Sequence, residues 1–248
     1  MNQEQLSTGV ADHLRGHKDA MIADWARLVD QGARADEQEA IAKTAALLAE
    51  IAGEAGIPCT LIPTGENTPP VVAGTTRNAP PGAAPIVFGG HYDTVFTASE
   101  SLARPFRIEG GKAYGPGVLD MKGGIVMSLY IIRAFLDAGY AEHPFKIVYC
   151  GDEEPGHPGA TTVDVLKDES RGGLFAFNME TGREHGNFCV GRRGVCDVSL
   201  VVHGRAAHSG NDFAKGIHAI EEMAHKIIAM HKLTPPDLRY TVSANVIS

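Results

Sequence analysis

Residues 114–124 form a stretch rich in glycine and proline that presents a single carboxylate, Asp120. An apolar pattern with helical spacing begins directly behind it at Ile125. The glycine pairs on either side let the backbone pass close to a compact charged group. A carboxylate held at a fixed point in this way can bridge two cations, so we interpret Asp120 as a metal ligand.

Three apolar segments with the character of buried strands each run into possible metal ligands. Residues 85–88, 145–150 and 174–179 are followed by His91 with Asp93, by Asp152, Glu153 and Glu154, and by Glu180. Ligands of open α/β sheets bind beyond the carboxyl ends of the strands. Taken singly, the motifs fit a local hydrogen-bonded pair or a solvated acidic turn. Together they predict one metal site around Asp120.

The spacing inside these motifs suggests individual roles. His91 and Asp93 are two residues apart and point the same way in an extended chain. A metal-bound imidazole commonly donates its second N–H to a carboxylate, so we expect His91 to be a ligand and Asp93 to orient it. Glu153 and Glu154 face opposite sides of an extended strand and cannot both bind one metal without a turn. Pro155 offers that turn, and the spacing leaves open which glutamate is the ligand.

The rest of the chain supplies the elements that must hold these side chains. Apolar residues at helical spacing predict one or two helices in residues 5–30, another in residues 37–55 and a third around residues 160–167. Short β runs are expected at residues 59–62 and 71–73. Strands that alternate with helices in this way are typical of an α/β fold.

The pattern changes beyond residue 187. Residues 194–204 alternate apolar and polar side chains like a half-exposed antiparallel strand, residues 211–232 have helical spacing, and residues 238–247 begin a further strand. We therefore predict two domains, residues 1–186 and residues 187–248, of which the second is the start of an α+β domain.

The composition is that of an ordinary soluble globular protein, with 44% hydrophobic and 21% charged residues. The net charge of -8 argues against nucleic acid or an anionic membrane as a partner. No segment has the apolar length of a signal peptide or a membrane span, which leads us to expect a cytoplasmic protein. Cys59, Cys150, Cys189 and Cys196 form no Cys-x-x-Cys pair and are expected to be small buried apolar residues.

The motifs together resemble those of the co-catalytic zinc peptidases, the family of glutamate carboxypeptidase, aminoacylase, acetylornithine deacetylase and succinyl-diaminopimelate desuccinylase. The matching elements, in order, are His91-x-Asp93, Asp120-Met121-Lys122-Gly123-Gly124, Asp152-Glu153-Glu154 and Glu180-Thr181-Gly182. The resemblance implies an α/β catalytic domain with a mixed, largely parallel sheet and helices on both faces. It also implies a smaller α+β lid domain that mediates homodimerisation.

The resemblance assigns the metal ligands. His91, Asp120 and Glu180 are implied to hold one Zn²⁺, and Asp120 to bridge to a second Zn²⁺ that also takes Glu154. The family uses two zinc ions per site, and Co²⁺ is expected to substitute for them. One ligand of the second zinc has no match, because in the family it is a histidine from a C-terminal return of the catalytic domain. We expect that part to be absent here, and the chain to hold at most one zinc tightly.

The catalytic roles are likewise implied by the resemblance. Asp93 orients the histidine ligand, and Glu153 is the general base that activates a metal-bridging hydroxide. His208 is similar to the lid histidine that reaches the partner subunit's active site and steadies the oxyanion. The implied substrates are small peptides or N-acyl amino acids, and the implied activity is that of a metallocarboxypeptidase-like exopeptidase or a deacylase. We expect this chain by itself to hydrolyse such amides poorly.

Two other functions stay open at this point. A chain that lacks part of the catalytic domain could serve as a binding or dimerisation module of the same fold. A two-metal phosphoesterase also uses bridging aspartate and histidine ligands, but it needs cations for the phosphate. The nearby candidates for that role are Lys122, Arg192 and Arg193.

Overall fold

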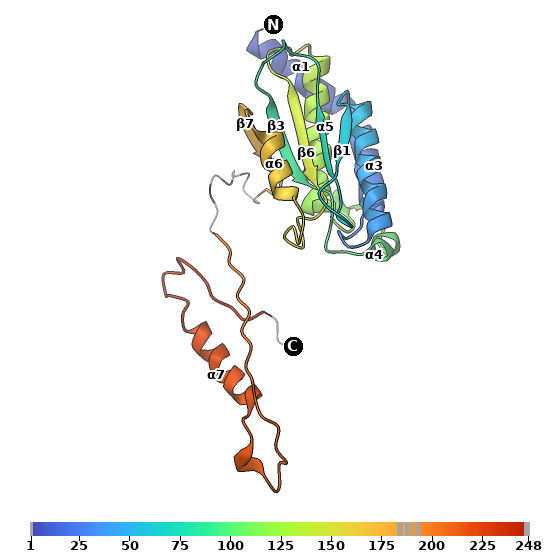
Figure 1. The fold of residues 1–248 in the computed structure, drawn as a ribbon. Helices are drawn as coiled ribbons and strands as arrows, with labels where there is room; N and C mark the ends of the chain where they lie inside the picture. The colour runs from blue at the N-terminus through green and yellow to red at the C-terminus, as the bar shows by residue number, and fades with distance from the viewer. Residues whose placement is uncertain (1, 183–185, 187–188, 190, 192–193, 246–248) are drawn as a thin grey trace. The chain divides into compact units, whose positions relative to one another are not determined.

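The computed structural model describes residues 2–182, 186, 189, 191 and 194–245. Contacts within the chain divide it into two compact units, Met1–Arg183 and Glu184–Ser248. The first unit is a sheet with helices packed on it, and the second contains a helix and extended chain (Figure 1). Every candidate site residue except His208 belongs to the first unit.

Three amphipathic helices begin the first unit: α1 (Gln3–Gly16), α2 (Lys18–Asp30) and α3 (Gln38–Glu54). The Asn2 side chain caps α1 by accepting a hydrogen bond from the Gln5 backbone N–H, and the Gln5 side chain accepts one in return. The helices predicted for this region are confirmed, and the first predicted segment contains two of them. None of the helices that the structure describes has the length and apolar character of a membrane span.

The central sheet has five strands: β1 (Cys59–Ile62), β2 (Val71–Thr75), β3 (Ile86–His91), β6 (Phe145–Cys150) and β7 (Phe175–Asn178). They lie in the order β1-β2-β6-β3-β7. β2 pairs antiparallel with β1 and β6, whereas β3 pairs parallel with β6 and β7. Because β2 alone runs against the other strands of this sheet, the predicted mixed and largely parallel arrangement is confirmed.

The register of the sheet brings the candidate ligands to one edge. His91 lies opposite Cys150, and Gly89 lies opposite Asn178. The chain segments that follow β3, β6 and β7 therefore leave the sheet at the same edge, where parallel strands place their ligands. Close to their starts, these segments carry Asp93, the acidic triplet at residues 152–154, and Glu180.

β7 forms where a buried strand was predicted, but its residues are exposed. Phe175 and Phe177 are 59% and 49% exposed. The strand lies at the end of the sheet and pairs only with β3 among the described strands. An edge strand lacks the second neighbour that covers a central strand, so its apolar sequence did not suffice to predict its burial.

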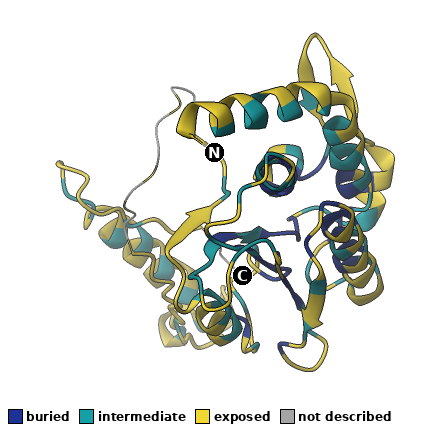
Figure 2. Ribbon diagram, turned by 90° about the horizontal axis from the view of Figure 1, so that it is seen from above, coloured by how far each residue is buried: buried dark blue, intermediate teal, exposed yellow. Residues whose placement is uncertain are grey.

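Helices cover both faces of the sheet. α5 (Gly123–Asp137) packs with α3 on one face, in a core that includes Leu129. α6 (Thr162–Ser170) covers the other face, where Val165 packs on a cluster that contains Val87. Figure 2 shows the buried residues gathered in the sheet and on the helix sides that face it. The expectation of helices on both faces is confirmed.

Shorter elements connect β3 to α5. α4 (Ala98–Ala103) and a hairpin of β4 (Arg107–Glu109) and β5 (Lys112–Tyr114) come first, and the sequence did not predict them. They lead to η1 (Val118–Lys122), an irregular helical turn that carries the candidate bridging carboxylate. Gly117, just before it, has a φ of 68°, a left-handed conformation that glycine adopts without strain.

The start of α5 passes close to the end of β7. A Cβ atom on Gly124 would lie 1.9 Å from the carbonyl oxygen of Met179. Only glycine permits this approach, which sets the Asp120 turn beside the strand end that leads to Glu180. The close neighbour of Gly124 is therefore main chain and not the charged group that the glycine pair predicts.

Two predicted strands of the second domain are absent from its described residues. Residues 194–204 and 238–245 are irregular, and an isolated bridge joins Arg205 to Ile217. Alternation of side chains marks an apolar face, but a strand forms only where a neighbour completes its hydrogen bonds. The described part of this unit offers no such neighbour, so both predictions were wrong for its described residues, and residues 246 and 247 of the second predicted strand lie outside them.

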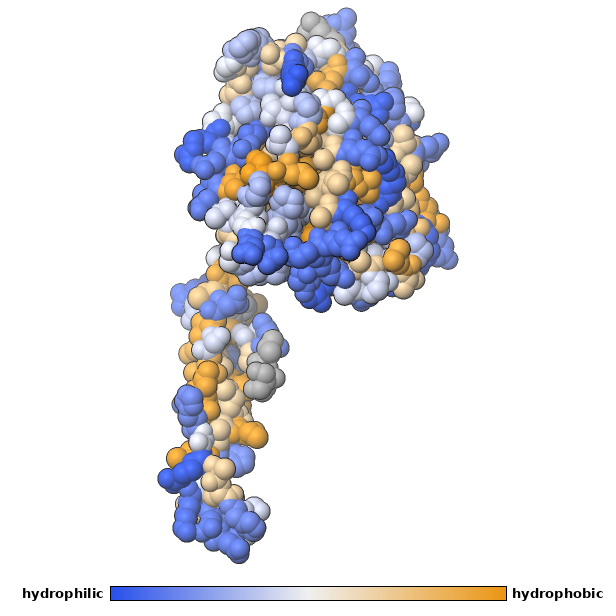
Figure 3. Space-filling model, turned by 45° about the vertical axis from the view of Figure 1, so that its right-hand side comes forward, coloured by the Kyte–Doolittle hydropathy of each residue, from blue (hydrophilic) through white to orange (hydrophobic). Residues whose placement is uncertain are grey.

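The helical part of the second unit is short and exposed. In place of the helix predicted at residues 211–232, the structure has η2 (Phe213–Lys215) and α7 (Ala219–His231). No residue that the structure describes in this unit is buried. Val195 is 91% exposed and Ile220 is 78% exposed, and Figure 3 shows hydrophobic side chains along its surface. The described residues of the unit therefore enclose no core of their own.

The four free cysteines fall into two classes. Cys150 is buried and Cys59 is partly buried, whereas Cys189 and Cys196 are exposed. The expectation that all four are buried was wrong for the last two, because they lie in the second unit. Burial raises the pKa of the Cys59 thiol to about 11 and also raises the pKa of Cys150.

We expect titration with a chromogenic disulfide reagent at mildly alkaline pH to separate these classes. Cys189 and Cys196 should react rapidly in the folded protein, and Cys59 and Cys150 only after unfolding, because buried thiols with raised pKa values are inert. The double variant Cys189→Ser, Cys196→Ser should lose the rapid phase. Rapid reaction of all four thiols in the folded protein would contradict this assignment.

Substitution of Gly124 tests the close approach of α5 to β7. The methyl group of Gly124→Ala would overlap the Met179 carbonyl, and overpacking of this kind costs about 1–3 kcal/mol. Gly53→Ala is the matched control, because Gly53 lies in α3 and, apart from its chain neighbours and the backbone of its own helix, no atom lies within 4 Å of its Cβ position. There alanine should stabilise the helix by about 1 kcal/mol. Urea unfolding measures the free energy of unfolding of both variants. Equal values for Gly124→Ala and the wild type would refute the contact.

Candidate metal centre

His91 is the last residue of β3, and its imidazole is buried. Its Nδ1 lies 3.2 Å from the Oδ1 of Asp93 and 3.2 Å from the carbonyl oxygen of the same residue. Both oxygens are acceptors, so Nδ1 carries a proton and Nε2 faces away from Asp93. The contact that the spacing of these two residues predicted is present.

Three carboxylates approach the other ring nitrogen of His91. Nε2 lies 3.1 Å from Asp120 Oδ1, 3.3 Å from Glu180 Oε1 and 3.8 Å from Glu153 Oε2. The ligand atoms of His91, Asp120 and Glu180 all lie within 4.8 Å of one another. Zinc bonds of about 2.0–2.2 Å can accommodate the separations of 3.1 Å and 3.3 Å between His91 Nε2 and the two carboxylate oxygens. The fold thus assembles three side chains that are far apart in sequence.

The Asp93 carboxylate connects this group to the acidic turn after β6. Asp93 is fully buried. Its Oδ1 accepts a hydrogen bond from the Glu153 backbone N–H at 3.3 Å, and its Oδ2 accepts one from the Glu154 backbone N–H at 3.0 Å. Asp93 therefore fixes the histidine and both glutamates relative to one another, a connection that the sequence did not reveal.

The electrostatics of the group favour a bound cation. Burial lowers the pKa of His91, but hydrogen bonds and charge from Asp93 and Glu180 outweigh it and raise that pKa to about 11. Burial raises the pKa of Glu154, and Asp120 and other nearby carboxylates raise it further. The raised pKa of His91 reflects the negative charge around it, which a divalent ion would offset. One imidazole nitrogen and several carboxylate oxygens are also a donor set that zinc accepts.

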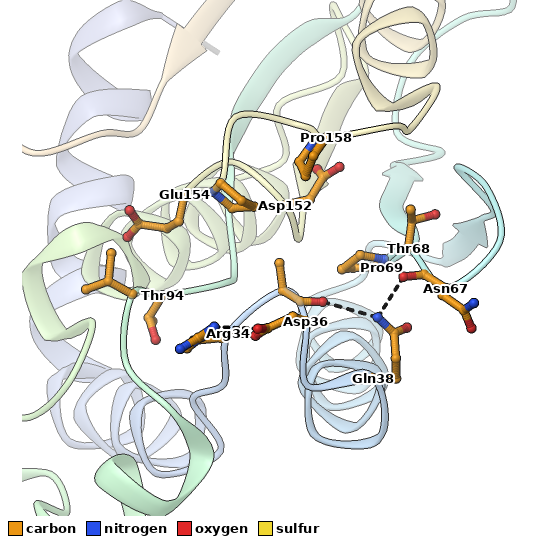
Figure 4. A pocket seen from close by; sticks show the side chains of 13 residues that line it. Arg34, Asp36, Gln38, Asn67, Thr68, Pro69, Thr94, Asp152, Glu154 and Pro158 are labelled. Atoms are coloured by element: carbon orange, nitrogen blue, oxygen red, sulfur yellow. Dashed lines mark hydrogen bonds and ion pairs between the residues drawn. The ribbon is translucent and has the colours of Figure 1, made fainter. Parts of the chain in front are cut away.

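Glu154 faces a pocket of roughly 560 Å³ beside the carboxylate group. The opposite wall contains Arg34, Asp36 and Asn67, from the loops before α3 and before β2 (Figure 4). Arg34 Nε donates to Asp36 Oδ1 at 2.9 Å, so the charge of this arginine is already paired. These three residues were not predicted, because no motif or spacing in the sequence connects them to the strand ends.

Lys122 does not face the site as a phosphate-binding cation would. Its side chain is fully buried, and its Nζ has no hydrogen-bond partner among the described residues. Burial lowers the pKa of Lys122 to about 7, against the charges of Asp93 and Asp30, which raise it. Arg192 and Arg193 lie outside the described residues. The described residues therefore give no support to a phosphoesterase.

His208 lies in the second unit and is exposed there. Its Nδ1 accepts hydrogen bonds from the backbone N–H groups of Gly210 and Asn211, each at 3.1 Å. These contacts close the turn in which the residue was predicted. The role of His208 in catalysis stays a prediction.

Two enzymes are similar in sequence to part of this chain. Carboxypeptidase G2 of Pseudomonas sp. (strain RS-16) is 28% identical over 149 residues, which cover 59% of this chain and 35% of that protein. Succinyl-diaminopimelate desuccinylase of Gluconobacter oxydans (strain 621H) is 30% identical over 156 residues, or 60% of this chain and 39% of that protein. This chain thus spans well under half the length of these relatives.

The fold and a family profile agree with these similarities. The aminopeptidase PepT of Bacillus cereus ATCC 10987 matches 84% of this chain and 55% of its own, with a TM-score of 0.56 and 18% identity, which shows a common fold. The sequence profile of peptidase family M20/M25/M40 matches residues 87–246, well over half of the chain. This chain therefore belongs to peptidase family M20/M25/M40.

Proposed function

We propose that this chain is the metal-binding part of a zinc-dependent hydrolase of peptide or N-acyl amide bonds. The observation that carries the proposal is the convergence of His91 Nε2 with the carboxylates of Asp120 and Glu180, next to that of Glu153. The relatives whose names state an activity, a carboxypeptidase and a desuccinylase, support amide hydrolysis on small peptides or N-acyl amino acids.

The proposed ligands of the first ion are His91, Asp120 and Glu180. Asp120 and Glu154 are the proposed protein ligands of a second ion. The side chain of Asp120 is 59% exposed and Glu154 lines the pocket, which leaves room for that ion. When bound, zinc supplies a nucleophile at neutral pH by lowering the pKa of water to about 7. Co²⁺ is proposed to substitute for zinc.

Glu153 is the proposed general base. Its Oε2 approaches His91 Nε2 to 3.8 Å while its side chain remains 47% exposed, so the carboxylate reaches the ligand group and still contacts water. It would take the proton of the attacking water and pass it to the leaving nitrogen, a contribution of about 10²- to 10⁴-fold. Asp93 is the proposed orienting partner of His91, on the basis of the contacts described above.

The second unit is proposed to be a lid and dimerisation domain, with His208 as its contribution to the active site of the partner subunit. The exposed apolar side chains of this unit support a surface that another chain covers. The domain division is proposed at residues 1–186 and 187–248. Cys189 and Cys196, which are free and exposed, support a reducing compartment such as the cytoplasm. A binding module without catalysis is not favoured, because the relatives named above are enzymes.

Metal content after exhaustive dialysis tests the proposal. The wild-type chain should retain no more than one zinc ion, and Asp120→Ala should lose it, because that variant removes a ligand. Asp164→Ala is the control, since Asp164 is an exposed residue of α6. Equal zinc in the wild type and in Asp120→Ala would refute the site, and two zinc ions in the wild type would refute the stated stoichiometry.

Glu153→Gln separates catalysis from metal binding. The amide cannot accept the proton, so hydrolysis of a panel of dipeptides and N-acyl amino acids should fall by about 10²- to 10⁴-fold. The retained zinc should match that of the wild type, because Glu153 is not a proposed ligand. Glu142→Gln, at an exposed position, is the control. An unchanged rate in Glu153→Gln would exclude this residue as the base.

A further inference from the structure

The turn that carries Glu153 and Glu154 is built on a second buried carboxylate, that of Asp152. Asp152 is 2% exposed. Its Oδ1 accepts a hydrogen bond from His157 Nδ1 at 2.8 Å, and its Oδ2 accepts one from Thr162 Oγ1 at 2.7 Å. The side chains of Asp152 and Glu154 point to different sides of the turn (Figure 4). Asp152 and Glu154 both line the pocket, but the carboxylate of Asp152 is held by hydrogen bonds within the protein.

The main chain closes the same turn. The backbone N–H of His157 donates to the Asp152 carbonyl at 2.9 Å, and that of Gly156 donates to the Glu153 carbonyl at 2.8 Å. His157 has a φ of 59°, which is uncommon for a residue other than glycine. The His157 side chain is thus held back over the start of the turn, where it meets the carboxylate of Asp152.

The opposite side of the turn is held by Asp93, which accepts the backbone N–H groups of Glu153 and Glu154. Two buried carboxylates therefore fix the two glutamates. Asp93 fixes them relative to His91, and Asp152 fixes the path of the chain that carries them. Without the hydrogen bonds to either carboxylate, the turn that carries Glu153 and Glu154 would be free to shift relative to His91.

The contacts favour a hydrogen-bonded cluster over a second metal site at this place. Ligand atoms of Cys150, Asp152 and His157 lie within 4.8 Å of one another. The distance of 2.8 Å between His157 Nδ1 and Asp152 Oδ1 is, however, that of a direct hydrogen bond. Thr162 occupies the other carboxylate oxygen, and the Cys150 thiol donates to the Gly90 carbonyl at 3.6 Å. Burial also raises the pKa of Cys150, which disfavours the thiolate.

We propose that His157, through its hydrogen bond to Asp152, is a positioning residue that sets the placement of Glu153 and Glu154. The inference rests on the proposed function for the roles of the two glutamates. The geometry of the turn itself does not depend on those roles. Its test therefore includes one readout that needs neither metal nor substrate.

His157→Asn and His157→Asp are an isosteric pair that isolates the hydrogen bond. Both residues tolerate a positive φ, and an asparagine amide reaches the place of Nδ1 and can donate to Asp152. The aspartate presents only acceptors and repels that carboxylate. Thr162→Val and Thr161→Val are a second matched pair, because Thr162 bonds Asp152 whereas Thr161 Oγ1 bonds the Thr64 carbonyl.

We expect amide hydrogen exchange of residues 153–157 to be faster in His157→Asp and Thr162→Val, and close to wild type in His157→Asn. Loss of such a supporting contact typically costs about 10- to 100-fold in metal affinity or activity, so kcat should fall by that factor in His157→Asp with little change in KM. His157→Asn should restore it. Thr161→Val should leave kcat near that of the wild type.

Three results would overturn the inference. One is exchange in His157→Asp that equals the wild type. Another is equal impairment of both His157 variants, which would mean that the hydrogen bond is not what matters. The third is a thiolate charge-transfer band in the Co²⁺-loaded protein that Cys150→Ser and His157→Asn both remove, because this would make the cluster a metal site. A wild type without metal or hydrolysis refutes the proposed function instead, and the exchange data still decide the inference.

Discussion

The candidate site depends on one buried carboxylate, that of Asp93. A buried anion must be satisfied by hydrogen bonds or charge, and Asp93 has both. It contacts His91 Nδ1, accepts the backbone N–H groups of Glu153 and Glu154, and interacts with the buried ammonium of Lys122. These partners come from β3, from the turn after β6 and from η1, so one carboxylate holds three segments in place relative to one another.

The site concentrates negative charge to a degree that a stable fold does not require. Three carboxylates approach Nε2 of His91, those of Asp120, Glu153 and Glu180. Glu154 is close enough to interact electrostatically with Asp120 and Glu153. Like charges at such distances repel one another, and this repulsion adds to the effect of burial in raising the pKa of Glu154. Repulsion between neighbouring carboxylates is expected at functional sites, where a bound ligand offsets their charge. A divalent cation is the simplest group that would do so here.

The two units differ in whether their described residues enclose an apolar core. The first unit encloses a continuous core around Leu129 and Ile147. In contrast, Val195 and Ile220 of the second unit present apolar surface to solvent. Exposed apolar area costs roughly 25 cal/mol per Å² relative to burial. The conformation of these regions therefore depends on what covers them, whereas the arrangement at the strand ends depends on contacts within the first unit.

The sequence by itself determined the main helices and the five central strands of the first unit, and it pointed to the group of candidate ligands, because helical periodicity and apolar strands ending in acids are local signals. Tertiary structure decided the rest. The pocket residue Arg34 and the buried Lys122 carry no local signal, because their surroundings come from distant segments. The strand predicted at residues 194–204 fails for the same reason. The alternation of side chains is encoded locally in the sequence. The hydrogen bonds of a strand require a neighbouring strand, and whether one is present depends on the tertiary structure.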